Sequence, residues 1–248
     1  MRIKILTLFP EMFMPVLGAS ITGRAIDNGI LAIEPINIRD YTLNKHHRCD
    51  DYPYGGGAGM VMTPQPVFDC MRAAMKDFPA RRILLSPRGA VLTQQRAKEL
   101  AQEENLIFLC GHYEGVDQRA IDALIDEEIS IGDYVLTGGE LGSDESAQEE
   151  SFSDALLEYP QYTRPAVYEG MSVPDVLLSG HDANIKKWRR ERSLDITRER
   201  RPELLEKAQL EQSDRVYLGW EAPPIKRRRH KKKPATPAQE PENLPEEP

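Results

Sequence analysis

The chain has 248 residues and a formal net charge of −8, which suits one or two domains with a sizeable hydrophobic core. Its three cysteines are odd in number and never form a Cys-x-x-Cys pair, which argues against a disulfide framework and a zinc site. No apolar run reaches the roughly 18 residues of a membrane span, and the short apolar N-terminal stretch alternates like a strand rather than a signal sequence. We therefore expect a soluble, cytoplasmic protein.

The first part of the chain alternates strand and helix patterns. The expected strands are 3–9, 31–38, 82–86, 106–110 and 129–136, and the expected helices are 20–28, 66–78, 93–104 and 117–126. Gly29 would stop the first helix, and Thr93 would cap the third. Residues 45–63 are too polar and too rich in glycine for either element. This alternation predicts an α/β fold over residues 1–141, with a mostly parallel sheet and helices on both faces.

After Leu141 the character of the chain changes. We interpret residues 142–159 as an acidic interdomain linker, because its first ten residues contain one apolar side chain, Ala147. Residues 152–218 contain helical stretches and no convincing strand, and Pro202 could start one of these helices at its first position. We therefore predict a small all-helical domain at 160–218. Residues 219–248 are rich in proline, lysine and glutamate and predict a disordered tail.

Positive charge gathers in the C-terminal third, although the whole chain is acidic. Residues 181–201 hold eight Lys or Arg against four Asp or Glu, and residues 226–233 hold seven with no acid. Such runs indicate a localised contact with a polyanion, although a solvated helix face is the more common interpretation of either run alone. Trp188, between Lys187 and Arg189, either packs inward or lies against a nucleic-acid backbone.

Three consecutive strands end in turns that contain glycine or proline. These turns are Ser86-Pro87-Arg88-Gly89, Gly111 and Gly138-Gly139. Each alone could be an ordinary strand exit. Because parallel neighbours bring their carboxyl ends to one edge of a sheet, the three together predict a shared pocket where backbone atoms contact a small cofactor.

The segment richest in glycine is Tyr54-Gly55-Gly56-Gly57-Ala58-Gly59-Met60. It is not a phosphate loop, because no Gly-Lys-Ser/Thr follows and Met60 stands where Gly-x-Gly-x-x-Gly needs glycine. It is either a mobile turn or a loop that lets a flat base approach the backbone, with Asp50 or Asp51 as hydrogen-bond acceptor. No metal-ligand spacing or nucleophile triad is present, and we predict no metal site.

Nine segments carry a family resemblance: 8–13 (Leu-Phe-Pro-Glu-Met-Phe), 22–25, 50–60, 85–89, 110–117, 130–141, 162–165, 176–181 and 201–205. In this order they resemble the bacterial tRNA (guanine-N1)-methyltransferases, which belong to the knotted SPOUT superfamily. The resemblance covers nearly all of the chain up to about residue 206. It implies a homodimer with a deep trefoil knot in each subunit, a fold feature that is otherwise rare.

The resemblance also implies S-adenosylmethionine as the methyl donor and the guanosine just 3′ of a tRNA anticodon as the substrate. The implied donor-binding residues are Ser86, Pro87, Arg88, Gly111, Ile131, Gly132, Asp133, Tyr134, Val135, Leu136, Gly138 and Gly139. The implied substrate-binding residues are Asp50, Tyr54, Gly55, Gly56, Gly57, Gly59, Lys187, Trp188 and Arg189. The C-terminal helical domain would grip the anticodon stem.

The implied reaction needs a base and a cation. Guanine N1 carries a proton, which a carboxylate within hydrogen-bond reach could remove, and a cation near O6 would stabilise the charge that develops. The resemblance implies Glu150 as the base, where the family has aspartate. The longer side chain moves the carboxylate by about 1 Å, and a shift of this size can cost ~100-fold in rate.

The chain also departs from the family directly after Leu141. There the family has an apolar helix that passes through the knot, helps form the dimer and carries a catalytic arginine; about 15 to 20 residues, or 22–30 Å of helix, are absent here. The acidic linker has no apolar face with which to replace it. Three hypotheses remain: an active enzyme in which Arg164 supplies the positive charge, a degenerate homologue that binds tRNA without methyl transfer, or a deletion product that folds poorly.

Overall fold

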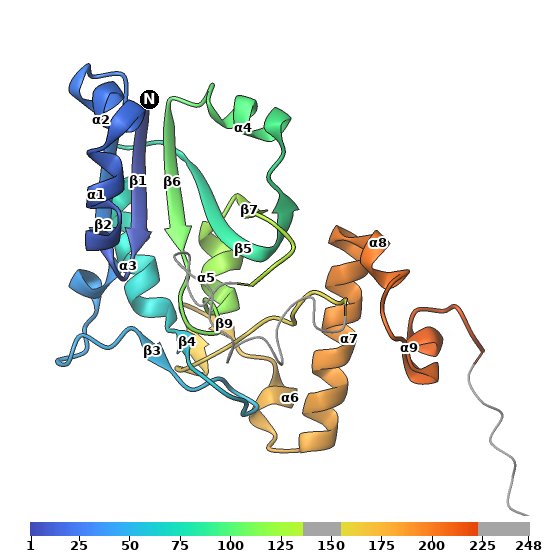
Figure 1. Ribbon diagram of the computed structural model, residues 1–248. Coiled ribbons are helices and arrows are strands. Elements are labelled where there is room, and N and C mark those ends of the chain that lie inside the picture. The colour runs from blue at the N-terminus through green and yellow to red at the C-terminus, as the bar shows by residue number, and fades with distance from the viewer. Residues whose placement is uncertain (136–154, 223–248) are drawn as a thin grey trace, which may run out of the picture.

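The computed structural model describes residues 1–135 and 155–222, and its centre is a parallel sheet of five strands (Figure 1). The strands are β1 (Arg2–Thr7), β2 (Ala32–Asn37), β5 (Arg81–Val91), β6 (Asn105–Cys110) and β7 (Glu127–Ser130). They lie in the order β2-β1-β6-β5-β7, and each neighbouring pair is parallel. The predicted α/β fold with a mostly parallel sheet is confirmed.

Helices cover both faces of this sheet, as the alternation predicted. The helices of this part are α1 (Met14–Leu17), α2 (Ser20–Asp27), α3 (Pro64–Met75), α4 (Gln94–Leu100) and α5 (Gln118–Leu124), with 3-10 turns at η1 (Pro10–Met12) and η2 (Ile38–Tyr41). Side chains of α3 and α5 pack on one face with Leu84 and Ile107, whereas Leu100 of α4 packs on the other with Ile83 and Leu106. Successive residues of one strand therefore face opposite helices, which explains its continuous apolar sequence.

Two local signals marked helix ends correctly, although the predicted helices 66–78, 93–104 and 117–126 end earlier, at Met75, Leu100 and Leu124. The Thr93 hydroxyl accepts a hydrogen bond from the Arg96 amide at 3.1 Å, which caps α4. Gly29 follows α2 with a φ of 68°, a conformation that glycine adopts without strain.

The structure corrects two predicted strands and the prediction that residues 45–63 form no strand. β5 continues past Ser86 to Val91, and both Leu85 and Ala90 lie beside Ile129 of β7, so that residues 86–89 bulge out of the strand. β7 ends at Ser130 instead of residue 136. Within the glycine-rich region 45–63, β3 (Asp50–Asp51) and β4 (Val61–Met62) form a short antiparallel pair.

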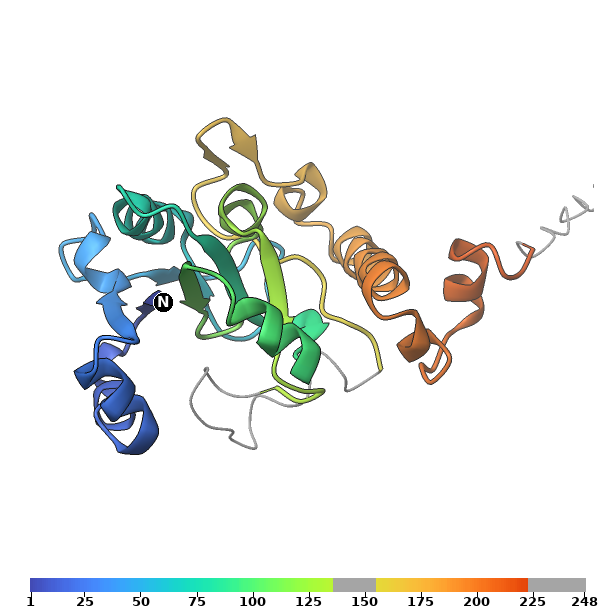
Figure 2. The same cartoon turned by 90° about the horizontal axis from the view of Figure 1, so that it is seen from above.

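The C-terminal part contains α6 (Asp175–Leu178), α7 (Asp182–Arg200), α8 (Pro202–Leu205) and α9 (Gln212–Tyr217). Pro202 does occupy the first turn of α8, as predicted. The prediction of no strand at 152–218 was wrong, because β8 (Val167–Tyr168) and β9 (Met171–Ser172) form a hairpin. Its turn residues, Glu169 and Gly170, both have positive φ, and strands of two residues are too short to give a periodic pattern. Figures 1 and 2 place α7–α9 at the end of the molecule opposite α1 and α2.

A buried ion pair joins the two parts of the chain. Asp117, the N-cap of α5, and Arg119 are 0% and 3% exposed, and Arg119 Nε lies 2.8 Å from Asp117 Oδ1. Arg119 donates to the carbonyl oxygens of Thr163 and Pro165 at 2.7 Å, and the Thr163 amide donates to Asp117 Oδ2 at 2.7 Å. Residues 163–165 are thereby held against the end of the sheet.

The described residues also bear on disulfide bonds, membrane spans and metal sites. The three cysteines are buried, and none of them forms a disulfide bond. In residues 1–135 and 155–222, every helix is too short or too polar to cross a bilayer. The same residues contain no cluster of three or more His, Cys, Asp or Glu side chains that could hold a metal ion. The linker predicted at 142–159 lies outside the described residues up to 154, and so does the predicted tail from 223.

Gly89→Ala should destabilise the protein by about 1–3 kcal/mol, the usual cost of overpacking. A Cβ on Gly89 would lie 2.5 Å from backbone atoms of Glu128 and Ile129, which cannot move without separating β5 from β7. Urea unfolding measures this effect. Gly18→Ala is the control, because its Cβ would lie 3.7 Å from the nearest atom and its φ is −80°. Equal stabilities of the two variants would contradict the prediction.

Candidate functional site

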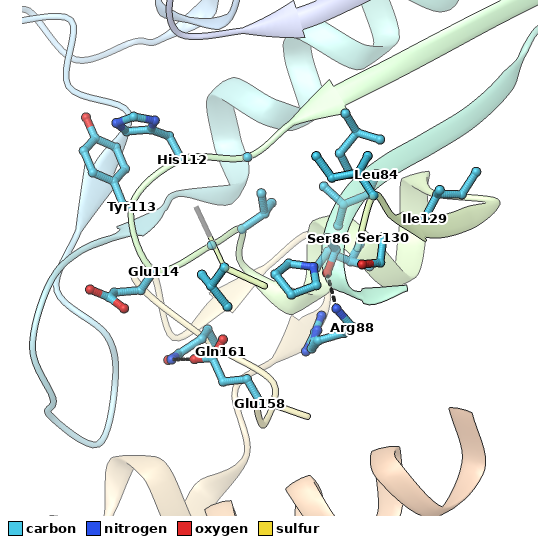
Figure 3. A pocket seen from close by; sticks show the side chains of 18 of the residues that line it. Leu84, Ser86, Arg88, His112, Tyr113, Glu114, Ile129, Ser130, Glu158 and Gln161 are labelled. Atoms are coloured by element: carbon cyan, nitrogen blue, oxygen red, sulfur yellow. Dashed lines mark hydrogen bonds between the residues drawn. The ribbon is translucent and has the colours of Figure 1, made fainter. Parts of the chain in front are cut away.

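A cavity lies beside the bulge of β5 and the carboxyl ends of β6 and β7, next to two of the three turns that predicted a shared pocket, residues 86–89 and Gly111 (Figure 3). Its lining comes from residues 84–88, 111–116, 121, 129–132, 134–135, 158 and 161. Because Leu85, just before the bulge, pairs with Cys110 of β6 and Ile129 of β7, the bulge lies beside the carboxyl ends of both neighbouring strands.

Eight of the twelve residues with a predicted role in donor binding line this cavity: Ser86, Pro87, Arg88, Gly111, Ile131, Gly132, Tyr134 and Val135. Asp133 is not part of the lining, and its carboxylate forms two hydrogen bonds with Arg201. Leu136, Gly138 and Gly139 lie outside the described residues.

One wall is the bulge of β5. The Ser86 hydroxyl accepts a hydrogen bond from the Arg88 amide at 3.2 Å, which turns the backbone toward the cavity (Figure 3). The Arg88 side chain is buried, donates to Gln118 Oε1 at 3.0 Å, and lies 3.5 Å from a carboxylate oxygen of Glu128. Burial would raise the pKa of Glu128, but the positive charges of Arg88 and Arg200 outweigh this effect and lower that pKa. The charge of Arg88 is therefore already balanced inside the protein.

The second wall is the segment that follows β7. The Ser130 hydroxyl donates to the Gly132 carbonyl at 2.7 Å and accepts from the Gly132 amide at 3.2 Å, which holds the first turn. The Tyr134 hydroxyl donates to the Ile131 carbonyl at 3.3 Å. Ile131 and Tyr134 remain about half exposed, at 52% and 51%. This wall offers backbone groups beside exposed apolar surface, a combination that suits a flat heterocycle.

Acidic residues that sequence reasoning did not single out complete the lining. Glu114 lies on the loop after β6, and Glu158 and Gln161 come from a separate segment on the other side of the cavity from Ile129 (Figure 3). Gln161 Nε2 donates to Glu158 Oε1 at 2.5 Å. Burial raises the pKa of Glu158 to about 7, and the nearby charge of Glu114 acts in the same direction. Glu114 belonged to the matched segment 110–117, but no local pattern pointed to Glu158.

Of the two predicted catalytic residues, the structure describes only Arg164. Arg164 Nη1 lies 2.9 Å from Asp51 Oδ1, and its side chain is exposed, with the guanidinium 5.5 Å from the centre of the Tyr54 ring. Arg164 is not among the residues that line the cavity. Glu150 lies outside the described residues.

The glycine-rich loop 54–59 packs against the C-terminal helices. Arg189 of α7 donates to the carbonyl oxygens of Gly56 at 2.6 Å and Tyr54 at 3.2 Å. A Cβ on Gly55 would lie 3.0–3.2 Å from side-chain atoms of Ile185, Arg189 and Leu177, so this loop requires glycine for close packing. This packing argues against the interpretation of residues 54–60 as a mobile turn.

The remaining predicted substrate-binding residues lie around this loop. Asp50 pairs with Met62 in β3 and β4. Trp188 packs inward with Tyr162 at a ring distance of 6.4 Å, which supports the first of its two interpretations. Gly57 lies in the packed loop, and a Cβ on Gly59 would lie 2.0 Å from Glu114 Oε1, so the loop also touches the cavity lining. Lys187 is exposed.

A parallel sheet with a cavity at the carboxyl ends of its strands places this chain among the open α/β proteins, in which ligands bind at that edge. The sequence model of the family described as "tRNA (Guanine-1)-methyltransferase TrmD" matches residues 1–207. The chain is 57% identical over 231 residues to a tRNA (guanine-N(1)-)-methyltransferase of Clostridium perfringens, covering 86% of this chain and 97% of the relative. A protein of the same name from Clostridium botulinum is 56% identical over 235 residues, covering 88% and 97%. The chain belongs to the tRNA (guanine-1)-methyltransferase family, a family of enzymes.

The alignment lengths also bear on the missing segment. The alignment with the Clostridium perfringens protein runs over 231 residues, whereas 86% of 248 residues is about 213. About 18 positions of the relative therefore have no counterpart in this chain. This difference agrees in size with the 15 to 20 residues that the resemblance implies are absent after Leu141.

Glu158→Gln should change how stability depends on pH. Because the pKa of Glu158 is raised from 4.5 to about 7 in the folded protein, ionisation favours the unfolded chain. The free energy of unfolding should fall as pH rises from about 5 through about 7 in the original protein, and less steeply in the variant. Urea unfolding at pH 5, 6, 7 and 8 tests this, with the exposed Glu206→Gln as control. A stability difference between variant and original protein that is equal at pH 5 and pH 8 would refute it.

Proposed function

We propose that this chain transfers a methyl group from S-adenosylmethionine to N1 of the guanosine that follows a tRNA anticodon on its 3′ side. The observation that carries the proposal is the cavity beside the bulge of β5 and the ends of β6 and β7, in a chain whose family match spans residues 1–207. The donor supplies an activated methyl group on a sulfonium ion. The protein supplies binding, orientation and proton transfer.

The described lining fits such a donor chemically. Backbone groups of Ser86, Gly111 and Gly132 would contact a nucleoside, and the exposed apolar surface of Ile131 and Tyr134 would cover its ring. S-adenosylmethionine carries positive charge at its sulfonium and amino groups. Glu114 and Glu158 place acidic side chains in the same cavity, which suits a cationic ligand.

The proton on guanine N1 has two candidate acceptors. The resemblance implies Glu150, and the cavity itself presents Glu158. A carboxylate with a pKa of about 7 is well matched to accept a proton at neutral pH. We assign the role to Glu150, and Glu158 is the alternative if the Glu150 variant retains turnover.

The positive charge near O6 is harder to assign. Arg164 would have to leave Asp51 to reach the cavity, and Arg88, the one Lys or Arg in the described lining, is paired with Glu128. About 18 residues that a relative contains are missing here. This deficit favours a second candidate function, a homologue that binds tRNA and donor without methyl transfer.

The proposal also includes binding of tRNA, assembly of two copies of the chain into a homodimer, and a trefoil knot in each subunit. It places the protein in the cytoplasm, where tRNA is. Single-stranded loop bases can be splayed out and read on their edges, which suits an anticodon-loop target. The exposed Lys186 and Lys187 of α7 would contact the phosphate backbone.

Two measurements, made one after the other, test the proposal. Calorimetry with S-adenosylmethionine measures donor binding, and methyl transfer to an unmodified tRNA with guanosine after the anticodon measures catalysis. Binding and transfer together support the proposal. Binding without transfer selects the second candidate, and the absence of both from a cooperatively folded protein overturns both.

Glu150→Gln should reduce methyl transfer by about 100-fold or more, because the amide cannot accept the N1 proton. Donor affinity should stay within about twofold, since the binding surface is otherwise intact. Single-turnover kinetics and calorimetry measure the two effects. Glu149→Gln is the matched control, a neighbouring glutamate to which no role is assigned. Unchanged transfer in Glu150→Gln would eliminate this residue as the base.

Lys187→Ala should weaken tRNA binding and reduce the slope of log affinity against log salt by about 1, as expected when one phosphate contact is lost. Filter binding or fluorescence anisotropy at several salt concentrations measures both. Lys98→Ala is the control, because this exposed lysine lies on α4, away from α7 (Figure 1). The assignment of α7 to the RNA contact fails if the two variants have equal slopes.

A further inference from the structure

The C-terminal end of α7 contacts the first wall of the cavity through Arg200. Arg200 Nη1 lies 2.7 Å from Glu128 Oε1 and 3.4 Å from the carbonyl oxygen of Arg88. The Glu128 side chain is 6% exposed and lies between Arg200 and Arg88, so one carboxylate joins the helix to a residue that lines the cavity. A buried carboxylate of this kind needs both partners, because removing one leaves an uncompensated charge.

The next residue, Arg201, holds the second wall. Its Nη1 and Nη2 donate to the two carboxylate oxygens of Asp133 at 2.8 and 2.9 Å, a bidentate pair. The Arg201 side chain is 12% exposed. Its hydrogen bonds lower the pKa of Asp133, so this carboxylate stays charged. Asp133 stands between Gly132 and Tyr134, both of which line the cavity.

The second wall depends on this support from outside. β7 ends at Ser130, so residues 131–135 have no strand partner, and the bonds from Ser130 to Gly132 and from Tyr134 to Ile131 lie within the segment itself. Two parallel hydrogen bonds to Asp133 fix the backbone that carries Gly132 and Tyr134. Asp133, which the resemblance implied as a donor-binding residue, instead attaches Gly132 and Tyr134, the neighbours that line the cavity, to Arg201.

We propose that Arg200 and Arg201 are positioning residues, which hold the two walls of the donor cavity in place and connect both walls to the C-terminal end of α7. This inference rests on the proposed function. The same helix carries the exposed Lys186 and Lys187 near its other end, and its 19 residues correspond to about 28 Å of rigid helix. Binding of tRNA to α7 and binding of donor to the cavity are therefore coupled, and by linkage each raises the affinity of the other.

The test uses Arg201→Ala and Asp133→Asn in the full chain, with the product S-adenosylhomocysteine as a ligand that cannot react. Each variant should bind this ligand about tenfold more weakly, the size expected for one lost charge-assisted pair. The double variant should be no weaker than either single one. In the original protein, added tRNA should tighten ligand binding, and this gain should disappear in both variants.

Arg198→Ala is the matched control, since it removes the same charge from the same helix but breaks an exposed pair with Asp195. It should bind the ligand within about twofold of the original protein and keep the gain on adding tRNA. Arg201→Lys, which keeps the charge without the two-pronged contact, should fall between the original protein and Arg201→Ala. If Arg201→Ala does not fold, Arg201→Lys and Asp133→Asn carry the test.

Equal ligand affinity in Asp133→Asn and Arg198→Ala would overturn the inference, as would additive losses in the double variant. An affinity loss with the tRNA effect retained would show that the pair supports folding of the wall but does not couple the two sites. Failure of the original protein to bind the ligand would instead contradict the proposed function, so the two failures are distinguishable.

Discussion

The buried pair of Asp117 and Arg119 is the interaction on which the rest of this structure depends. These residues and the intervening Gln118 form four hydrogen bonds to residues 161–165. The Gln118 amide donates to the carbonyl of Gln161 at 2.9 Å, and its side-chain oxygen accepts from Arg88. Since buried charges are tolerated when they are paired and fully hydrogen-bonded, this cluster holds one arrangement of the two parts of the chain. It brings Glu158 and Gln161 to the cavity.

The sequence predicted the sheet because its signals are local. Apolar runs such as 106–110, together with a polar cap such as Thr93, are enough to indicate alternating strands and helices. The predicted convergence of strand ends then follows from parallel pairing. The β5 bulge was missed because it depends on the approach of Gly89 to the backbone of β7, which adjacent residues do not encode. Glu158 was missed because only the pairing of distant segments places it in the cavity.

The described residues that line the cavity are distinct from the segment that the resemblance implies is missing. Within the part of the chain that the structure describes, the lining comes from residues 84–88, 111–116, 121, 129–132, 134–135, 158 and 161. The resemblance assigns the absent helix to the dimer, the knot and a catalytic arginine. Under the proposed function, donor binding would rest on the described lining and methyl transfer on the absent helix, so a chain of this kind could keep the first activity after losing the second.

The basic run at 181–201 has a different meaning in three dimensions than in the sequence. Each of its six arginines is engaged within the protein. Arg189 binds carbonyls of the glycine-rich loop, and the other partners are Asp214 for Arg190, Asp195 for Arg192 and Arg198, Glu128 for Arg200 and Asp133 for Arg201.

Lys186 and Lys187, in contrast, point their charges toward solvent, where Lys187 is 3.7 Å from Glu191. Because an arginine that already balances a carboxylate adds little net attraction for phosphate, a count of basic residues overstates the RNA-binding charge of this helix. Most of the positive charge of α7 organises the protein itself: the glycine-rich loop near one end and the donor cavity at the other. Lys186 and Lys187, which precede all six arginines of the run, are the cations that the proposed function assigns to the RNA contact.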